Sequence, residues 1–175
     1  MQTLVRPPRT GMEAFKLMPE GTYCQLVNDV LIISPASTTP HARVHRTIFS
    51  MLNNYVGQHG AGEVYFAPVD VYLNTKNAFQ PDIFYISDEN REIIKEEGVY
   101  GSPDLVIEIL SKGNRKTDLV KKKNVYQDAG VKEYCVVDPT TKWCEGFVLE
   151  NQVYKSLGTG NGELTIKMFD LTISF

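Results

Sequence analysis

The sequence lacks a long apolar segment, because no run approaches the roughly 18 residues needed to cross a bilayer. Its first residues also lack the apolar stretch of a signal peptide. Cysteine is scarce, and Cys24, Cys135 and Cys144 show neither CxxC spacing nor a pairing pattern. These absences argue against a membrane protein, a disulfide scaffold and a structural zinc site. We expect a cytoplasmic protein with no membrane partner.

A strong excess of one charge is also lacking, since 18 basic and 21 acidic residues give a net charge of −3. The protein as a whole therefore carries no basic field that would indicate nucleic-acid binding. Locally, the segment from Lys112 to Lys123 is strongly basic and has a single acidic residue. It either binds phosphates or forms the solvated face of a helix. The candidate nucleic-acid-binding residues are Lys112, Arg115, Lys116 and Lys121.

The overall composition is that of an ordinary folded chain. Hydrophobic residues make up 42% of the 175 positions and charged residues 22%, close to the average of soluble domains. No linker, repeat or low-complexity segment divides the sequence. We therefore predict a single domain over residues 1–175, large enough to bury its own core.

Apolar spacing and turn residues divide the chain into helices and strands. Helices are predicted at Met12 to Leu17, after the Thr38 to Pro40 cap as far as Val56, at 88–97 and at Arg115 to Ala129. The second of these has apolar residues at helical spacing, namely Val44, Ile48, Met51, Leu52, Tyr55 and Val56. Strands are predicted in a Tyr23 to Ile33 hairpin that turns at Asn28-Asp29, and at Val64 to Leu73, Phe79 to Ile86, Asp104 to Leu110, Glu133 to Val137, Trp143 to Leu149, Val153 to Leu157 and Leu164 to Phe175. The segment Gly158 to Gly162 is predicted to form a turn. This mixture favours an α/β or α+β fold with helices packed on a sheet.

Glu108 is an acidic residue inside the otherwise apolar strand Asp104 to Leu110. Such an apolar run is typical of a central strand that is buried on both faces. Burial of an unpartnered carboxylate is costly, so Glu108 indicates a metal ion, a cationic partner or a cleft. Alternatively, Glu108 lies near the strand end, where it reaches water or pairs with a lysine.

Carboxylates elsewhere are candidate partners of Glu108. Asp104 shares its face of the strand, but four residues of strand separate them by roughly 13 Å, too far for one metal ion. Asp82 opens the apolar run Ile83 to Ile86, and a neighbouring strand lies only about 4.8 Å away, so Asp82 and Glu108 could converge on a hard cation. Asp70 is a rival, although a solvent-facing acid at a strand edge is its simpler interpretation.

Lys122 is the lysine of the basic helix that is expected to point inward. If the apolar residues between Leu119 and Ala129 mark the buried face, Lys122 lies only about 20° from its centre and Lys121 about 120° away. A lysine beside acidic strand residues can stabilise the charge that develops on a phosphate. The alternative is a stem that extends along the surface and leaves the amine in water.

His41 and His45 are four residues apart on a predicted helix, so their rings share one face. The sequence has no HExxH and no evident third nitrogen or sulfur ligand, so polar or core roles are favoured over zinc. It also has no G-x-S-x-G, P-loop or G-x-G-x-x-G motif. Nucleophilic serine chemistry and the common nucleotide-binding loops are therefore not indicated.

A series of short motifs, each weak alone, occurs along most of the chain. They are Leu17 to Glu20, Pro40-His41, Ala67 to Val71, Gln80 to Asp82, Pro103 to Ser111, Lys122 with Tyr126, Ala129 to Val131, and Glu133-Tyr134 followed by Val137 to Pro139. In this order and spacing they resemble the Uma-two family of endonucleases, part of the PD-(D/E)XK restriction-endonuclease-like superfamily.

The resemblance implies a restriction-endonuclease-like mixed β-sheet flanked by helices. It also implies hydrolysis of phosphodiester bonds in nucleic acid, DNA rather than RNA, with Mg²⁺ or Mn²⁺ as cofactor. By motif match, Asp82 and Glu108 are catalytic residues and metal ligands, the backbone carbonyl of Ile109 is a third ligand, and Lys122 is the catalytic lysine. The superfamily's commonest form has this lysine two residues after the acid, where this chain has Leu110. The family supplies it from the next helix, in agreement with the inward angle of Lys122.

Three hypotheses follow from these residues. The leading one is a metal-dependent endonuclease, which could be a homodimer if it cuts both strands of a duplex. The second is a nuclease-fold protein that binds nucleic acid or assembles without cleaving, because Gln25 stands where the family usually has a glutamate. The third is a structural oligomer in which the acids and Lys122 form a buried charge network.

Overall fold

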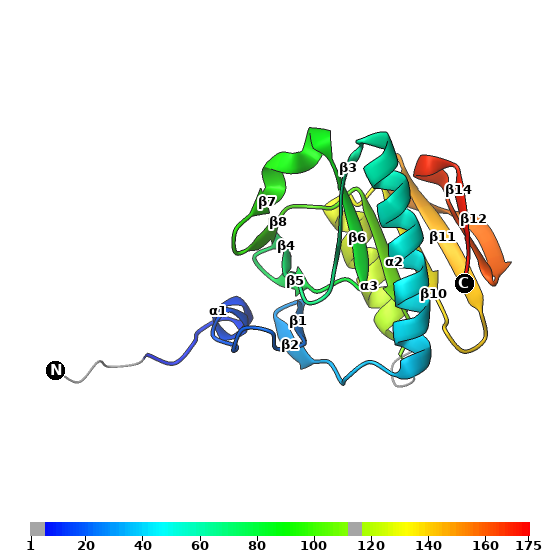
Figure 1. Ribbon diagram of the computed structural model, residues 1–175. Helices are drawn as coiled ribbons and strands as arrows, with labels where there is room; N and C mark the ends of the chain where they lie inside the picture. The colour runs from blue at the N-terminus through cyan, green and yellow to red at the C-terminus, as the bar shows by residue number, and fades with distance from the viewer. Residues whose placement is uncertain (1–5, 112–116) are drawn as a thin grey trace.

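The computed structural model describes residues 6–111 and 117–175, and Figure 1 shows their arrangement. Within this part of the chain, a six-stranded central sheet has the order β12-β11-β10-β9-β6-β3. Its strands are β3 (Gly62–Phe66), β6 (Ile83–Ser87), β9 (Leu105–Ile109), β10 (Glu133–Val137), β11 (Trp143–Glu150) and β12 (Val153–Asn161). Strands β9 and β10 run parallel and the other neighbouring pairs antiparallel. The sheet is therefore mixed.

The remaining described strands form a second six-stranded sheet and a hairpin. The second sheet has the order β2-β1-β5-β4-β8-β7. Its strands are β1 (Cys24–Val27), β2 (Val30–Ile33), β4 (Val71–Asn74), β5 (Asn77–Phe79), β7 (Ile94–Lys95) and β8 (Gly98–Tyr100). The hairpin pairs β13 (Glu163–Ile166) with β14 (Leu171–Ser174).

The described helices are α1 (Gly11–Lys16), α2 (Thr39–His59) and α3 (Thr117–Ala129), with 3-10 turns η1 (Asp88–Ile93) and η2 (Lys167–Phe169). Helix α2 begins as predicted, because the hydroxyl of Thr38 accepts a hydrogen bond from the His41 amide. It ends at Gly60, whose positive φ of 57° suits a residue without a Cβ. None of the described helices has the length and apolar character of a membrane-spanning segment.

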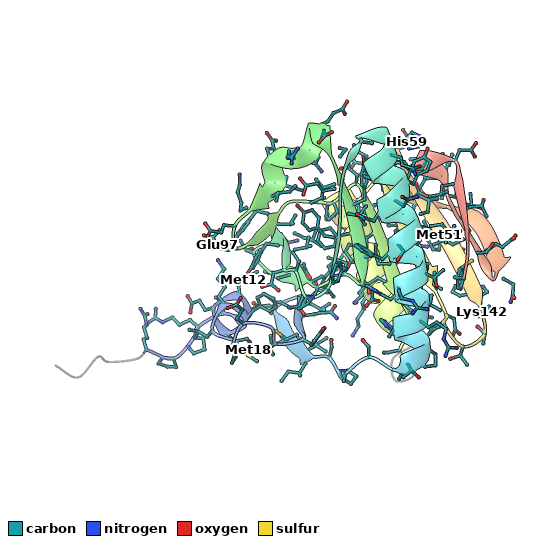
Figure 2. The ribbon with its side chains drawn as sticks, viewed as in Figure 1. Met12, Met18, Met51, His59, Glu97 and Lys142 are labelled. Carbon is teal, nitrogen blue, oxygen red and sulfur yellow. The ribbon has the colours of Figure 1, made fainter. Side chains whose placement is uncertain are left out.

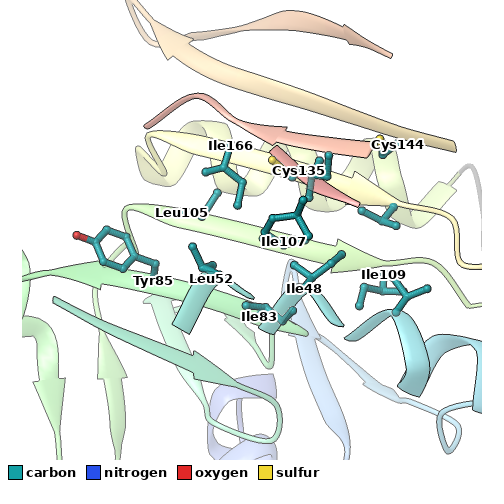
Figure 3. Packing of buried hydrophobic residues seen from close by; sticks show 14 of the residues in the cluster. Ile48, Leu52, Ile83, Tyr85, Leu105, Ile107, Ile109, Cys135, Cys144 and Ile166 are labelled. Atoms are coloured by element: carbon teal, nitrogen blue, oxygen red, sulfur yellow. The ribbon is translucent and has the colours of Figure 1, made fainter. Parts of the chain in front are cut away.

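The core occupies both faces of the central sheet. Ile107 of β9 packs with Ile48 and Leu52 of α2 on one face, as Figure 3 shows. The residues on either side of Ile107 point to the other face, where Val106 packs in the same cluster as Tyr126 of α3. This alternation places Glu108 on the α3 face. The outer side of α2 carries exposed residues such as Met51 (Figure 2), although its spacing suggested a buried position.

Several predicted boundaries are wrong, and two of the predicted strands each contribute to two sheets. Residues 64–73 and 79–86 each divide, at Pro68 and at Pro81, into a strand of the central sheet and a strand of the second sheet. Proline cannot donate to a strand ladder, so pairing ends there and the chain changes sheets. Similarly, 164–175 is a hairpin around η2, and residues 158–161 continue β12 instead of forming a turn. Residues 88–97 form η1 followed by β7.

The Asn28-Asp29 hairpin turn is confirmed. Both residues have positive φ angles, 49° and 66°, as a tight two-residue hairpin turn requires. In Figure 1 the hairpin lies next to β5, and a connecting segment leads from it to the N-terminal end of α2. Residues of the hairpin line the same cavity as Asp82 and Ile109.

Candidate active site

Asp82 and Glu108 come together because β6 and β9 are antiparallel neighbours. Ile83 pairs with Ile107, so the register brings the residue before Ile83 beside the residue after Ile107. The Asp82 carboxylate is fixed by backbone, since its Oδ2 accepts a hydrogen bond from the Ile109 amide at 2.7 Å. This cross-strand contact ties the end of one strand to the end of the next.

Two histidines of α2 hold the other side of Asp82. His41 Nε2 lies 3.2 Å from Asp82 Oδ1, and His45 Nε2 donates to the Asp82 backbone carbonyl at 2.9 Å. The two imidazole rings are stacked with centroids 6.5 Å apart, one helical turn from each other. Burial lowers the pKa of His41, but the Asp82 hydrogen bond and the charges of Asp82 and Glu108 outweigh it, so the pKa is raised above 6.5. The His41 imidazolium is thereby favoured beside the carboxylates.

Glu108 is buried on the α3 face and is held by Lys122 and Tyr126. Lys122 Nζ donates to both carboxylate oxygens at 3.0 Å, and the Tyr126 hydroxyl donates to Oε1 at 2.7 Å. The side chain of Glu108 is 8% exposed and that of Lys122 15%. Burial raises the pKa of Glu108; the Lys122 charge opposes this in part, and the nearby Asp82 charge adds to it. The Glu108 carboxylate therefore depends on its contacts with Lys122 and Tyr126 to remain charged.

These groups line a cavity of about 690 Å³. We call the part lined by Asp82, Glu108, Ile109 and Lys122 its floor. Lys121 also lines the cavity and is exposed to solvent. The walls come from the β1–β2 hairpin, the N-terminal end of α2 and the end of β3. The carboxylates and the lysine are thus open to a ligand that enters the cavity.

Other candidate residues lie elsewhere. Asp104 is buried at the opposite end of β9, where Oδ2 accepts from the Ser87 amide and Oδ1 pairs with Lys132 at 2.6 Å. Asp70 accepts hydrogen bonds from Gln80 and Tyr72 and does not line the cavity. Both acids therefore have structural partners away from the floor. Lys112, Arg115 and Lys116 lie outside the described residues.

The hydroxyl groups of two tyrosines also belong to the site, and they were not predicted from the sequence. Tyr126 follows Lys122 by one helical turn, and this spacing could have indicated that both contact Glu108. Tyr134 is 1% exposed and lines the cavity, yet its hydroxyl has no hydrogen-bond partner within the described residues. It lies within the apolar strand β10, so the sequence offers no signal for this role. This unsatisfied hydroxyl is close enough to Glu108 and Asp82 to interact with their charges.

The donor set at the floor fits a hydrated Mg²⁺ ion. No group of three or more His, Cys, Asp and Glu side chains is positioned to hold a metal in the described part of the chain. Mg²⁺ commonly uses only one or two carboxylates and keeps several water molecules. Asp82 and Glu108 provide two carboxylates that line the same cavity, and its volume leaves room for the water ligands.

Comparison with known proteins shows the family of this chain. The model of the Uma2 family, described as a putative restriction endonuclease, matches residues 12–174. The chain belongs to the Uma2 family. The comparison with curated proteins finds no match.

Among solved structures, a putative nuclease belonging to DUF820 from Anabaena variabilis is similar, with a TM-score of 0.77. Its sequence is 17% identical, and the match covers 95% of each chain. At this identity the likeness shows the fold, so this Uma2 chain has the restriction-endonuclease-like mixed α/β fold that the resemblance implied.

Proposed function

We propose that this Uma2 protein is a metal-dependent endonuclease that hydrolyses phosphodiester bonds in DNA. The observation that carries the proposal is the cluster of Asp82, Glu108 and Lys122 at the floor of an open cavity. The family description and the name of the structural neighbour support a nuclease in general. Two carboxylates and a lysine are the groups that metal-assisted phosphodiester hydrolysis uses.

Asp82, Glu108 and the backbone carbonyl of Ile109 would hold the ion. A bound Mg²⁺ or Mn²⁺ supplies a Lewis acid and a water molecule of lowered pKa. The Ile109 amide orients one carboxylate oxygen of Asp82, and His41 and His45 hold the other side of this residue. Asp82 therefore enters the reaction already positioned, which lowers the cost of orienting it.

Lys122 stabilises the negative charge that develops on the phosphate. Its ammonium group has three N–H donors, and two of them are directed at the two oxygens of Glu108. The third is left for a phosphoryl oxygen at the floor of the cavity. A fixed cation in a partly desolvated site stabilises this charge more strongly than it would in water.

The test is cleavage of supercoiled plasmid and of single-stranded circular DNA, with Mg²⁺ and with Mn²⁺. We expect cleavage by the unaltered protein and its loss in Asp82→Asn, which keeps the size of the side chain. Asp128→Asn, which changes an exposed aspartate of α3, is the matched control and should cleave normally. If neither DNA is cut by the unaltered protein, the endonuclease proposal is wrong. Binding without cleavage would then favour the nucleic-acid-binding alternative.

A further inference from the structure

One wall of the cavity is an exposed apolar surface on the β1–β2 hairpin. The register pairs Val27 with Val30 and Gln25 with Ile32, and paired residues of antiparallel strands point to the same face. All four line the cavity. Val30 is 60% exposed and Ile32 is 37% exposed, which is high for β-branched residues. The hairpin therefore presents apolar side chains to whatever enters the cavity.

Two exposed aromatic rings extend this apolar surface. Phe66, at the end of β3, and Tyr23, just before β1, are each 47% exposed, and both line the cavity. Phe66 is held from behind by edge contacts with Phe49 and His45, at centroid distances of 4.8 and 5.7 Å. A ring that is held in this way offers a rigid platform for stacking at little cost in entropy.

The same wall contains a polar atom that needs a partner. The Gln25 amide nitrogen donates to the Ser34 hydroxyl at 3.2 Å. Its carbonyl oxygen is buried and has no hydrogen-bond partner among the described residues. A buried acceptor without a donor costs free energy, and this oxygen can meet a ligand only if the amide turns toward the cavity that Gln25 lines. Apolar walls with one unpaired polar group match a flat apolar ring that carries a polar edge.

Among the described residues, few cationic side chains line the cavity, and most of them are paired with carboxylates. Lys122 is bound to Glu108 and His41 to Asp82, which leaves Lys121 at the solvent side. A duplex offers mainly phosphates and hides the faces of its bases, so a duplex site needs many free cations. Single strands instead expose base faces, which stack on aromatic side chains. The cavity volume of about 690 Å³ also lies in the range that accommodates small ligands, roughly 300–1,000 Å³.

We propose that the cavity binds unpaired nucleotides of a DNA strand beside the phosphate to be cleaved. The bases stack on Phe66 and Tyr23 and contact Val30 and Ile32, and Gln25 turns its amide to accept a hydrogen bond from a base edge. This inference rests on the proposed endonuclease function and adds that the substrate is single-stranded at the site. DNA that is fully paired would have to open before it could enter.

Fluorescence anisotropy tests the inference with three labelled probes of equal length. The probes are an oligothymidine, an abasic strand with the same phosphates, and a duplex. Binding is measured once with a chelator and once with Ca²⁺, so that it does not depend on cleavage. We expect the oligothymidine to bind at least about fivefold more tightly than either other probe, since stacking contributes about 1–3 kcal/mol per base.

Variants separate stacking from a change in fold. Phe66→Leu and Tyr23→Leu keep an apolar side chain and should each weaken oligothymidine binding about fivefold while leaving abasic binding unchanged. Tyr100→Leu is the matched control, because Tyr100 is 42% exposed, stacks on Tyr72 and lies outside the cavity. It should bind oligothymidine normally. Thermal unfolding verifies that each variant is folded.

The outcomes distinguish this inference from the proposed function. Duplex or abasic DNA that binds as tightly as oligothymidine would overturn the single-strand inference and leave the endonuclease proposal intact. Equal effects of Phe66→Leu on oligothymidine and abasic binding would also overturn it. If no probe binds and no DNA is cleaved, both proposals are wrong.

Discussion

Lys122 Nζ lies 3.0 Å from each carboxylate oxygen of Glu108, although the two residues belong to a helix and a strand fourteen positions apart in sequence. Both side chains are largely buried, so neither charge can be satisfied by water alone. The contact places a cation beside a carboxylate and next to Asp82 at the floor of the cavity. This ion pair serves both stability and the proposed chemistry, and the following predictions separate the two.

Replacing Lys122 with methionine should destabilise the fold by roughly 3 kcal/mol, because Glu108 is left buried without its cation. Urea unfolding monitored by circular dichroism measures this change. The double variant Lys122→Met with Glu108→Gln should recover much of the loss, since no unpaired charge remains. Lys121→Met changes an exposed lysine and should alter stability by less than about 0.5 kcal/mol. An unchanged stability in Lys122→Met would contradict the pair's structural role.

Asp82→Asn and Glu108→Gln should each abolish or strongly weaken binding of Mn²⁺ or Mg²⁺, because each removes one of two carboxylates at the floor. Isothermal titration calorimetry detects this binding directly, and a rise in melting temperature with added metal detects it independently. Asp128→Asn should bind metal as the unaltered protein does. Unchanged binding in both floor variants would remove them as ligands and favour a purely structural charge network.

Asp104 should make the fold sensitive to acid. Burial raises the pKa of Asp104, but Lys132 and the hydrogen bonds from Ser87 and Asn90 outweigh it, so the pKa falls below 3.8. A depressed carboxyl pKa contributes stability above the unfolded value, and this contribution is lost as pH falls through the folded value. Asp104→Asn should therefore cost about 1–3 kcal/mol at neutral pH and flatten the loss of stability below pH 3.8. Urea midpoints across this range test it; an equally steep acid loss in the variant would contradict it.

The pair of His41 with Asp82 should give the opposite pH dependence. The raised pKa of His41 means that its contribution to stability is fully present below pH 6.5 and is lost as pH rises through the folded value. Stability should thus decline from pH 6.5 upward, and His41→Asn should remove this decline. His59→Gln, at the exposed C-terminal end of α2, is the control and should retain it. Midpoints of chemical unfolding at several pH values provide the measurement.

The sequence alone predicted those features of the fold that depend on residues close together in the chain. The Thr38 cap and the apolar spacing of Val44, Ile48 and Leu52 predicted α2, and the apolar run around Glu108 predicted a strand buried on both faces. The helical angle of Lys122 also predicted an inward side chain, which the contact with Glu108 bears out geometrically. Each of these inferences depends only on local sequence, either on a capping residue or on the period of a helix or a strand.

Tertiary structure decided which strands share a sheet and which groups meet. Pro68 and Pro81 end pairing, but proline alone does not say that the chain crosses to a second sheet. The antiparallel register of β6 and β9 brought Asp82 beside Glu108, while Asp104 at the far end of β9 pairs with Lys132. Alternation along a strand fixes the face of a side chain, whereas the partner on that face depends on non-local pairing, which local residue patterns do not encode.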